Sequence, residues 1–174
     1  MRKKRVPSTP EELEGSAAEF FASVREESDR GCVLVAAAFL DEALESVLRS
    51  HMSRDTKVVR DVVDRLFGPE GPLGTFSAKI NPCRALQIIA QGDHDDLMRI
   101  RIRTPRNRFA HSHGAAGFAD QQVKDTTAAL SVFAEIKWVD RDDDAVDPAC
   151  KRFVFGAAWV AGSLHHQMRK MTVG

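Results

Sequence analysis

The amino-acid sequence predicts an all-α fold, a single-domain bundle of about six or seven helices. Apolar residues recur at spacings of three and four in most segments, and candidate capping residues precede several of them. No segment alternates apolar and polar residues for long, which argues against a sheet. The 174 residues suit one domain, so we assign residues 10–174 to it and residues 1–9 to a flexible basic tail.

Start signals locate the first two predicted helices. Ser8-Thr9-Pro10, followed by glutamates, predicts a helix whose apolar residues recur from Leu13 to Val24. Ser28-Asp29 opens a long second helix, which is apolar all round over CVLVAAAFL (32–40) and amphipathic afterwards. Because a membrane span needs roughly 20 apolar residues, this shorter run predicts a buried core helix.

The middle of the chain predicts two helices joined by a tight turn. Apolar residues at helical spacing predict a helix over residues 55–67. The segment GPEGPLG (68–74) restricts the backbone and lacks the GK[ST] ending of a phosphate-binding loop, so we expect a structured turn. Thr75 or Ser77 then caps a helix that we expect to run to Gly92.

The remaining third of the chain predicts three more helices. Asp93, Asp95 and Asp96 place negative charge where the next helix begins, which its dipole favours. Residues 118–138 and 149–171 each show helical spacing, and the acidic segment VDRDDDAVDP between them predicts a solvated loop.

The charge balance disfavours tight DNA binding. Lys and Arg number 25, as do Asp and Glu, so no positive excess is available to bind many phosphates. We expect weak, non-specific and salt-sensitive DNA binding at most, carried by the basic residues 2–5. Glutamates follow this basic segment, so it does not resemble a secretion signal.

The three cysteines, Cys32, Cys83 and Cys150, are scattered and form no CxxC pair. Their odd number and spacing indicate reduced thiols in a cytoplasm rather than a disulfide framework. His111 and His113 stand two apart, so on a helix they do not share a face, and no third ligand is spaced to join them. We therefore expect no metal site, and no sequence motif indicates a cofactor.

Apolar faces at 32–48 and 153–164 exceed what one small bundle requires, so we expect a homodimer. The segment 149–171 combines Phe153, Phe155, Trp159 and Leu164 with lysines and arginines near both ends. This composition favours a core or dimer helix, with a partner-binding or membrane-surface helix as the alternative. We expect no membrane association.

The stretch RTPRNRFAHS (103–112) holds the candidate site. Helical spacing continues the inward face of Leu97 and Ile100 through Asn107 and His111. Pro105 predicts a kink or restart, which places Arg106 and Asn107 in a first helical turn where free amides attract anions. The candidate anion- or partner-binding residues are Arg103, Arg106, Asn107, Arg108, His111 and His113. In the structural alternative, the arginines face solvent and the Asn/His pair satisfies neighbouring backbone.

Three blocks of the sequence resemble the mannitol operon repressor family and follow the family's order. They are SDRGCVLVAAAFLDEALESVLRSHM (28–52), LFGPEGPLGTFSAKI (66–80) and RNRFAHS (106–112). The resemblance implies a helical, cytoplasmic, often dimeric bacterial protein that regulates transcription of sugar-alcohol uptake genes. It implies action mainly through a protein partner, which we expect to belong to the sugar phosphotransferase system.

The same stretch is similar to the RNxxxH signature of HEPN ribonucleases. That resemblance implies metal-independent RNA cleavage by the arginine and histidine of two facing subunits, with Asn107 orienting the site. Arginine matches a phosphodiester and histidine exchanges protons near neutral pH, so the chemistry is consistent. Two hypotheses stand: a non-enzymatic repressor, which we favour, and a ribonuclease that uses Arg106, Asn107 and His111 across a dimer.

Alanine substitutions in this stretch separate the two hypotheses. If Asn107 and His111 are structural, replacing either should lower the free energy of unfolding by roughly 1–3 kcal/mol, because a buried partner loses its hydrogen bond. Arg106→Ala should be milder. The ribonuclease hypothesis instead expects His111→Ala to abolish RNA cleavage in EDTA at an unchanged melting temperature. Thermal unfolding and RNA cleavage, measured on each variant, distinguish these outcomes, and we expect the stability loss.

Overall fold

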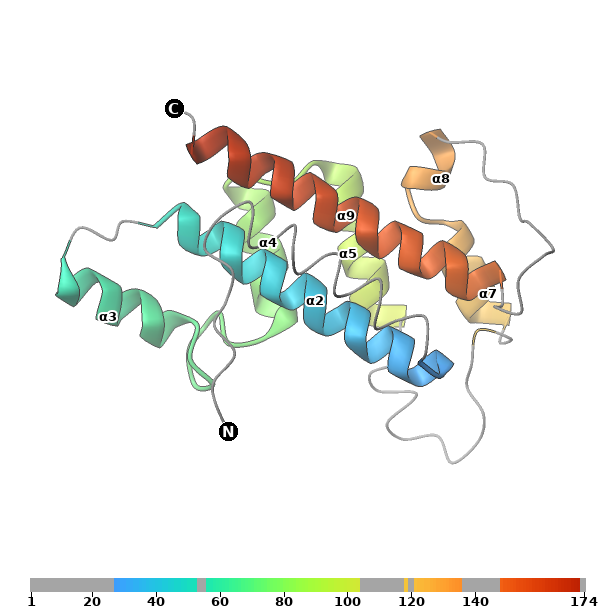
Figure 1. Cartoon of the computed structure of the whole chain (residues 1–174), viewed down its shortest axis with the longest axis horizontal. Helices are drawn as coiled ribbons and strands as arrows, with labels where there is room; N and C mark the ends of the chain where they lie inside the picture. The colour runs from blue at the N-terminus through green and yellow to red at the C-terminus, as the bar shows by residue number, and fades with distance from the viewer. Residues whose placement is uncertain (1–26, 53–55, 104–117, 119–120, 136–147, 173–174) are drawn as a thin grey trace.

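Two long helices run side by side through the centre of the molecule (Figure 1). The computed structural model describes residues 27–52, 56–103, 118, 121–135 and 148–172, and these helices are α2 (Asp29–Ser50) and α9 (Pro148–Thr172). They are parallel, because Cys32 lies beside Cys150 near their starts and Ser46 beside Met168 near their ends. Segments more than a hundred residues apart in sequence thus form the core.

Five further helices complete the part of the chain that the structure describes. α4 (Phe76–Ala85) packs on α2, and α7 (Gln121–Ala128) packs on α9. α5 (Gln91–Arg103) contacts α4, α7 and α9, whereas α3 (Lys57–Leu66) lies at one side (Figure 1). The short α8 (Val132–Glu135) follows α7. These residues form seven helices and no strand, which confirms the predicted all-α bundle.

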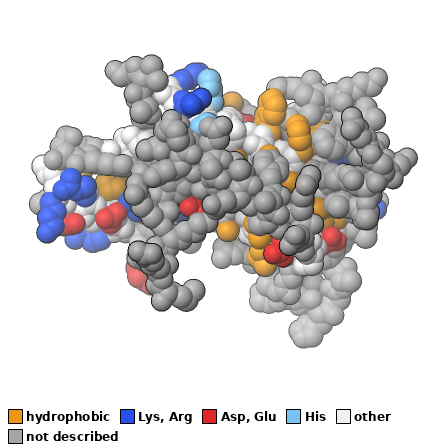
Figure 2. Space-filling model, in the orientation of Figure 1, with side chains coloured by type: hydrophobic (Ala, Val, Ile, Leu, Met, Phe, Trp, Pro, Cys, Tyr) orange, Lys and Arg blue, Asp and Glu red, His pale blue; other side chains and the backbone are white. Residues whose placement is uncertain are grey.

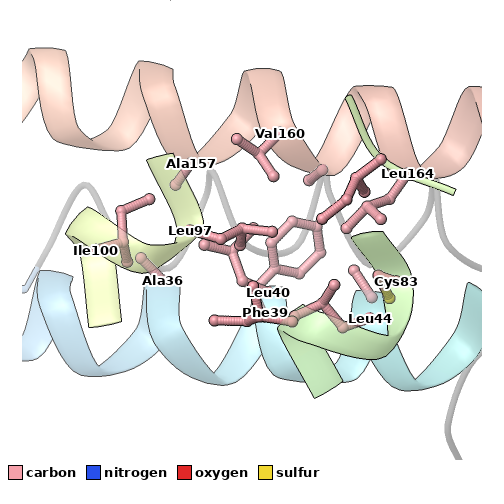
Figure 3. Packing of buried hydrophobic residues seen from close by; sticks show 14 of the residues in the cluster. Ala36, Phe39, Leu40, Leu44, Cys83, Leu97, Ile100, Ala157, Val160 and Leu164 are labelled. Atoms are coloured by element: carbon pink, nitrogen blue, oxygen red, sulfur yellow. The ribbon is translucent and has the colours of Figure 1, made fainter. Parts of the chain in front are cut away.

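The core is made of the apolar faces that the sequence periodicity indicated. Figure 3 shows Leu40 and Leu44 of α2 opposite Val160 and Leu164 of α9, with Leu97 of α5 between them. All five side chains are fully buried. Each such burial stabilises the fold by about 1.5–3 kcal/mol relative to an exposed side chain.

Side-chain caps confirm the predicted helix starts. The hydroxyl of Ser28 accepts a hydrogen bond from the Gly31 amide at 3.2 Å, which fixes the start of α2. Thr75 caps α4 in the same way through the Ala78 amide. Between α3 and α4, residues 68–74 form a tight turn in which the Leu73 amide donates to the Leu66 carbonyl at 2.9 Å. The structured-turn prediction is therefore confirmed.

One predicted boundary was wrong, because α4 ends at Ala85 and not near Gly92. Gln87 adopts a left-handed conformation, with φ of 58°. The amides of Ile88 and Gln87 donate to the carbonyls of Cys83 and Arg84, which is the pattern of a Schellman cap. Glycine usually occupies the left-handed position at a helix end, so a glutamine at this position does not predict that the helix ends there.

The single helix expected over residues 118–138 was also wrong. α7 ends at Ala128 and α8 begins at Val132, and the Asp96 carboxylate of α5 binds the Ser131 amide between them. Phe118 precedes α7, and its ring packs against that of Phe153 with centroids 5.7 Å apart. The predicted helix over 10–24, the kink at Pro105 and most of the acidic loop before α9 lie outside the described residues.

Gly71 and Gly68 provide a matched test of the turn. A Cβ added at Gly71 would lie 2.2 Å from the Arg65 carbonyl oxygen, so the backbone would have to move. We expect Gly71→Ala to lower the free energy of unfolding by about 1–3 kcal/mol. A Cβ at Gly68 would meet its nearest atom at an ordinary 3.4 Å, so Gly68→Ala should change the urea midpoint little. Equal destabilisation of both variants would contradict this account of the turn.

Candidate functional site

The structure describes only the beginning of the helix that carries the predicted site. Leu97 and Ile100 are buried, so the predicted inward face of α5 is confirmed over these residues. Arg103 is the last residue of α5, and its side chain is not among those described. The other predicted site residues lie outside the described residues: Arg106, Asn107, Arg108, His111 and His113.

A buried lysine joins α2 to α4 through two carboxylates. Lys79 Nζ donates to Asp41 Oδ1 at 2.7 Å and to Glu45 Oε2 at 2.9 Å, and its side chain is only 3% exposed. Glu45 also accepts from Arg49, which reaches Asp64 of α3 at 2.6 Å. Each charge in this chain of contacts has a partner of opposite sign. The network therefore fixes the junction of three helices, because removing one partner would leave a charge uncompensated in a largely buried site.

Two aspartates of α5 hold neighbouring segments in place. The Asp96 carboxylate, with a side chain 1% exposed, accepts from the Ser131 amide at 2.9 Å and from its hydroxyl at 2.7 Å. Arg99 donates to the same carboxylate at 3.1 Å. Asp93 accepts from the Ser163 hydroxyl of α9 at 2.8 Å. The prediction of an acidic first turn is confirmed for Asp93 only, because α5 begins at Gln91. Asp93 and Asp96 also connect α5 to α9 and to the residue before α8.

The three cysteines, Cys32, Cys83 and Cys150, are free and buried. The Sγ atoms of Cys32 and Cys150 lie 3.5 Å apart, although the two residues are remote in sequence. The hydrogen bond with Cys150, followed by burial, raises the pKa of Cys32. Burial raises the pKa of Cys83 to about 12. Thiolate, the reactive form, is therefore scarce at neutral pH at Cys32 and Cys83.

The last helix presents one apolar face to the core and another face to solvent. Phe153 and Leu164 are buried, whereas Trp159 is 43% exposed. We define the α9 stripe as Trp159, Gly162, His166, Arg169 and Lys170, which are exposed and follow one another at helical spacing. Figure 2 shows hydrophobic side chains over the middle of α9 and cationic and histidine side chains where its C-terminal half runs. The buried residues confirm the prediction that this helix belongs to the core, and the role of its exposed face stays a prediction.

Neither Lys79 nor Asp96 was assigned a buried contact from the sequence. Lys79 does give a signal, because it stands four residues before the inward-facing Cys83 and so shares its helix face. A lysine at such a position predicts a carboxylate partner. The sequence gives no such signal for Asp96, because an acidic residue near a helix start is equally consistent with an exposed side chain.

Within the described part of the chain, no cluster of three or more His, Cys, Asp or Glu side chains could hold a metal ion. None of the described helices combines the length and apolarity that a membrane span requires. The described residues supply paired charges, buried thiols and an exposed aromatic and cationic stripe. Such a stripe is suited to protein recognition.

Comparison with known proteins gives a family and a fold. A family model described as mannitol repressor matches residues 22–168. The solved structure of the MtlR-HPr complex from Escherichia coli contains a similar chain, with a TM-score of 0.60 and 17% sequence identity. The match covers 92% of this chain and 98% of that chain, so the two share their fold over nearly their full lengths. No curated protein matches the sequence.

Asp96 and Asp95 allow a matched test of the α5 contacts. Asp96→Ala leaves the buried Ser131 amide and hydroxyl without their acceptor, so we expect a loss of roughly 1–3 kcal/mol in the free energy of unfolding. Asp95 is adjacent but 47% exposed in its side chain, so Asp95→Ala should change the urea midpoint little. Urea unfolding followed by circular dichroism measures both. A stable Asp96→Ala protein would exclude Asp96 as a structural anchor.

Proposed function

Because the chain belongs to the mannitol repressor family, we propose that it is a cytoplasmic, non-enzymatic repressor of sugar-alcohol uptake genes. The match over residues 22–168 is the observation that carries this proposal. The family match extends over all of α2 and over α9 as far as Met168, and these two helices form the centre of the core. The family match therefore covers the part of the chain that determines the fold, which supports a shared regulatory role.

We further propose that the chain acts through a protein of the HPr kind. The similar chain from Escherichia coli was solved in a complex with HPr. Its fold is similar to that of this chain over nearly the full length of both, which supports a partner of the same kind for this chain. A partner of this kind would link the repressor to the sugar phosphotransferase system, as expected from the sequence resemblance.

Direct DNA contact has a minor part in this proposal. The chain carries 25 cationic and 25 acidic side chains, so its electrostatic attraction for a duplex is small. Weak, salt-sensitive binding through residues 2–5 would bring the protein near DNA without selecting an operator. Selectivity then comes from the partner or from a complex of both proteins.

A metal-independent ribonuclease remains the second candidate, supported by the RNxxxH signature at Arg106, Asn107 and His111. It requires a homodimer that brings two such stretches together. The apolar faces at 32–48 and 153–164, which motivated the dimer prediction, pack against each other within one chain. We retain the homodimer as a proposal, now resting on the family resemblance.

Calorimetric titration with the HPr of the source organism tests the regulatory proposal. We expect saturable binding with a Kd in the micromolar range or tighter, because a regulatory contact must respond to partner concentration. Duplex DNA in physiological salt should bind far more weakly and show no preference for the operator. Absence of HPr binding, or nanomolar binding of the operator by the chain alone, would contradict the proposal.

A further inference from the structure

Two of the three cysteines meet where the central helices begin. Cys32 stands in the first turn of α2 and Cys150 in the first turn of α9, and both turns lie at the same end of the molecule (Figure 1). Their Sγ atoms are 3.5 Å apart, although 118 residues separate them in sequence. The fold therefore brings together two thiols that no sequence motif joins.

The third cysteine provides an internal comparison, because it has no such neighbour. Cys83 of α4 and Cys32 are both fully buried, at 0% exposed. No thiol of the described residues lies within hydrogen-bond distance of Cys83, whereas Cys32 and Cys150 are joined by a hydrogen bond. Burial alone therefore does not distinguish the pair, and its distinctive feature is the second sulfur.

The two thiols of the pair lie in different environments. The hydrogen bond with Cys150, followed by burial, raises the pKa of Cys32, and the carboxylates of Asp29 and Glu27 act in the same direction. Cys32 therefore keeps its proton and can donate it to Cys150 Sγ. Cys150 stands near the N-terminus of α9, where free amides and the helix dipole favour a thiolate. Cys150 is thus suited to attack an oxidant, and Cys32 to react second.

Access to the pair depends on the helix starts. Cys32 is 0% exposed and Cys150 is 8% exposed, so the folded chain covers the pair and leaves Cys150 the nearer to solvent. The first turn of a helix opens more readily than its middle, because its amides have no acceptor within the helix. A small oxidant can therefore reach Cys150 through local opening, without unfolding of the core.

We propose that Cys32 and Cys150 form an oxidisable dithiol, which a hydroperoxide converts to a reversible disulfide between α2 and α9. First, the Cys150 thiolate attacks one peroxide oxygen, the O–O bond breaks, hydroxide leaves, and Cys150 becomes a sulfenic acid. The Cys32 sulfur then attacks the sulfenic sulfur, the S–S bond forms, and the hydroxyl leaves as water with the Cys32 proton. The two sulfurs lose two electrons in total, and the peroxide gains them. A dithiol reductant restores both thiols by exchange.

The disulfide draws the two helix starts together. An S–S bond measures about 2.05 Å, so the Sγ atoms approach each other by about 1.5 Å from their separation of 3.5 Å. The same junction holds Phe118, whose amide donates to Asp29 Oδ2 at 2.9 Å and whose ring packs on that of Phe153. Oxidation therefore acts on the junction of α2, α9 and Phe118. Transient disulfides of this kind are compatible with a cytoplasm that keeps thiols reduced at rest. The inference does not depend on the proposed function.

Oxidation of the purified, reduced chain with hydrogen peroxide tests the pair directly. Wild type should lose two hydrogens in intact mass, and N-ethylmaleimide in denaturant should then block one cysteine instead of three. Peptide mapping should link Cys32 to Cys150, and dithiothreitol should restore all three thiols. A folded chain that forms no disulfide until urea unfolds it overturns the inference. A disulfide that includes Cys83 or joins two chains also overturns it.

Alanine variants test the order of attack. Cys32→Ala should stop at a Cys150 sulfenic acid that dimedone traps, because the second thiol is missing. Cys150→Ala should leave Cys32 unmodified. Cys83→Ala is the matched control, since it removes an equally buried thiol and should form the disulfide at the wild-type rate. Circular dichroism verifies the fold of each variant, and the peptide map of wild type needs no variant. Faster dimedone labelling of Cys32 than of Cys150 in the two single variants overturns the assigned order.

Thermal unfolding measures the effect of the cross-link. The disulfide joins residues 118 apart in sequence, so it restricts the unfolded chain and should raise the melting temperature of oxidised wild type by about 5–10 °C. Cys83→Ala should show the same rise on oxidation, and Cys32→Ala and Cys150→Ala should show none. An unchanged or lower melting temperature in oxidised wild type would mean that the disulfide does not hold α2 and α9 together, and this part of the inference would be wrong.

Discussion

The parallel contact between α2 and α9 is the interaction on which the other elements depend. Leu40 and Leu44 reach Val160 and Leu164 across it, and α4, α5 and α7 each pack on one or both of these helices. The contact determines which residues of α9 are buried, and therefore which remain on the solvent side as the α9 stripe. The solvent-facing position of the α9 stripe is thus a consequence of core packing.

Helix starts could be predicted from the sequence because their causes are local. Ser28 and Thr75 cap helices through amides three residues away, so the signal and its effect occupy one short segment. The missed features depend on remote partners or on backbone geometry. The helix predicted over residues 118–138 is interrupted between α7 and α8, where Asp96 accepts a hydrogen bond from the amide of Ser131, 35 residues away in sequence. α4 ends where Gln87 adopts a left-handed conformation, and glutamine at this position does not predict that conformation.

In the candidate site, too, local features could be predicted from the sequence, whereas those that depend on remote neighbours could not. The RNxxxH signature is recognisable from six adjacent letters, but its role depends on neighbours that the sequence does not name. For α9, composition predicted an apolar and cationic helix, whereas the choice of its outward face required the structure. Leu130 lies against Gly156, and Phe133 packs 6.0 Å from Phe155 between ring centroids. These contacts cover part of the helix and leave Trp159 and Gly162 outside.

The parallel alignment of α2 and α9 also governs how the chain can fold during synthesis. Cys32 and Cys150 meet across 118 residues, and Ser46 and Met168 across 122. Such long loops must close before the central contact forms, which slows folding relative to a bundle of sequential hairpins. α4 can cover one part of the apolar face of α2 soon after its synthesis, but the part that α9 buries stays uncovered until residues 148–172 have followed. We therefore expect nascent chains of this protein to be prone to aggregation until α9 has been synthesised.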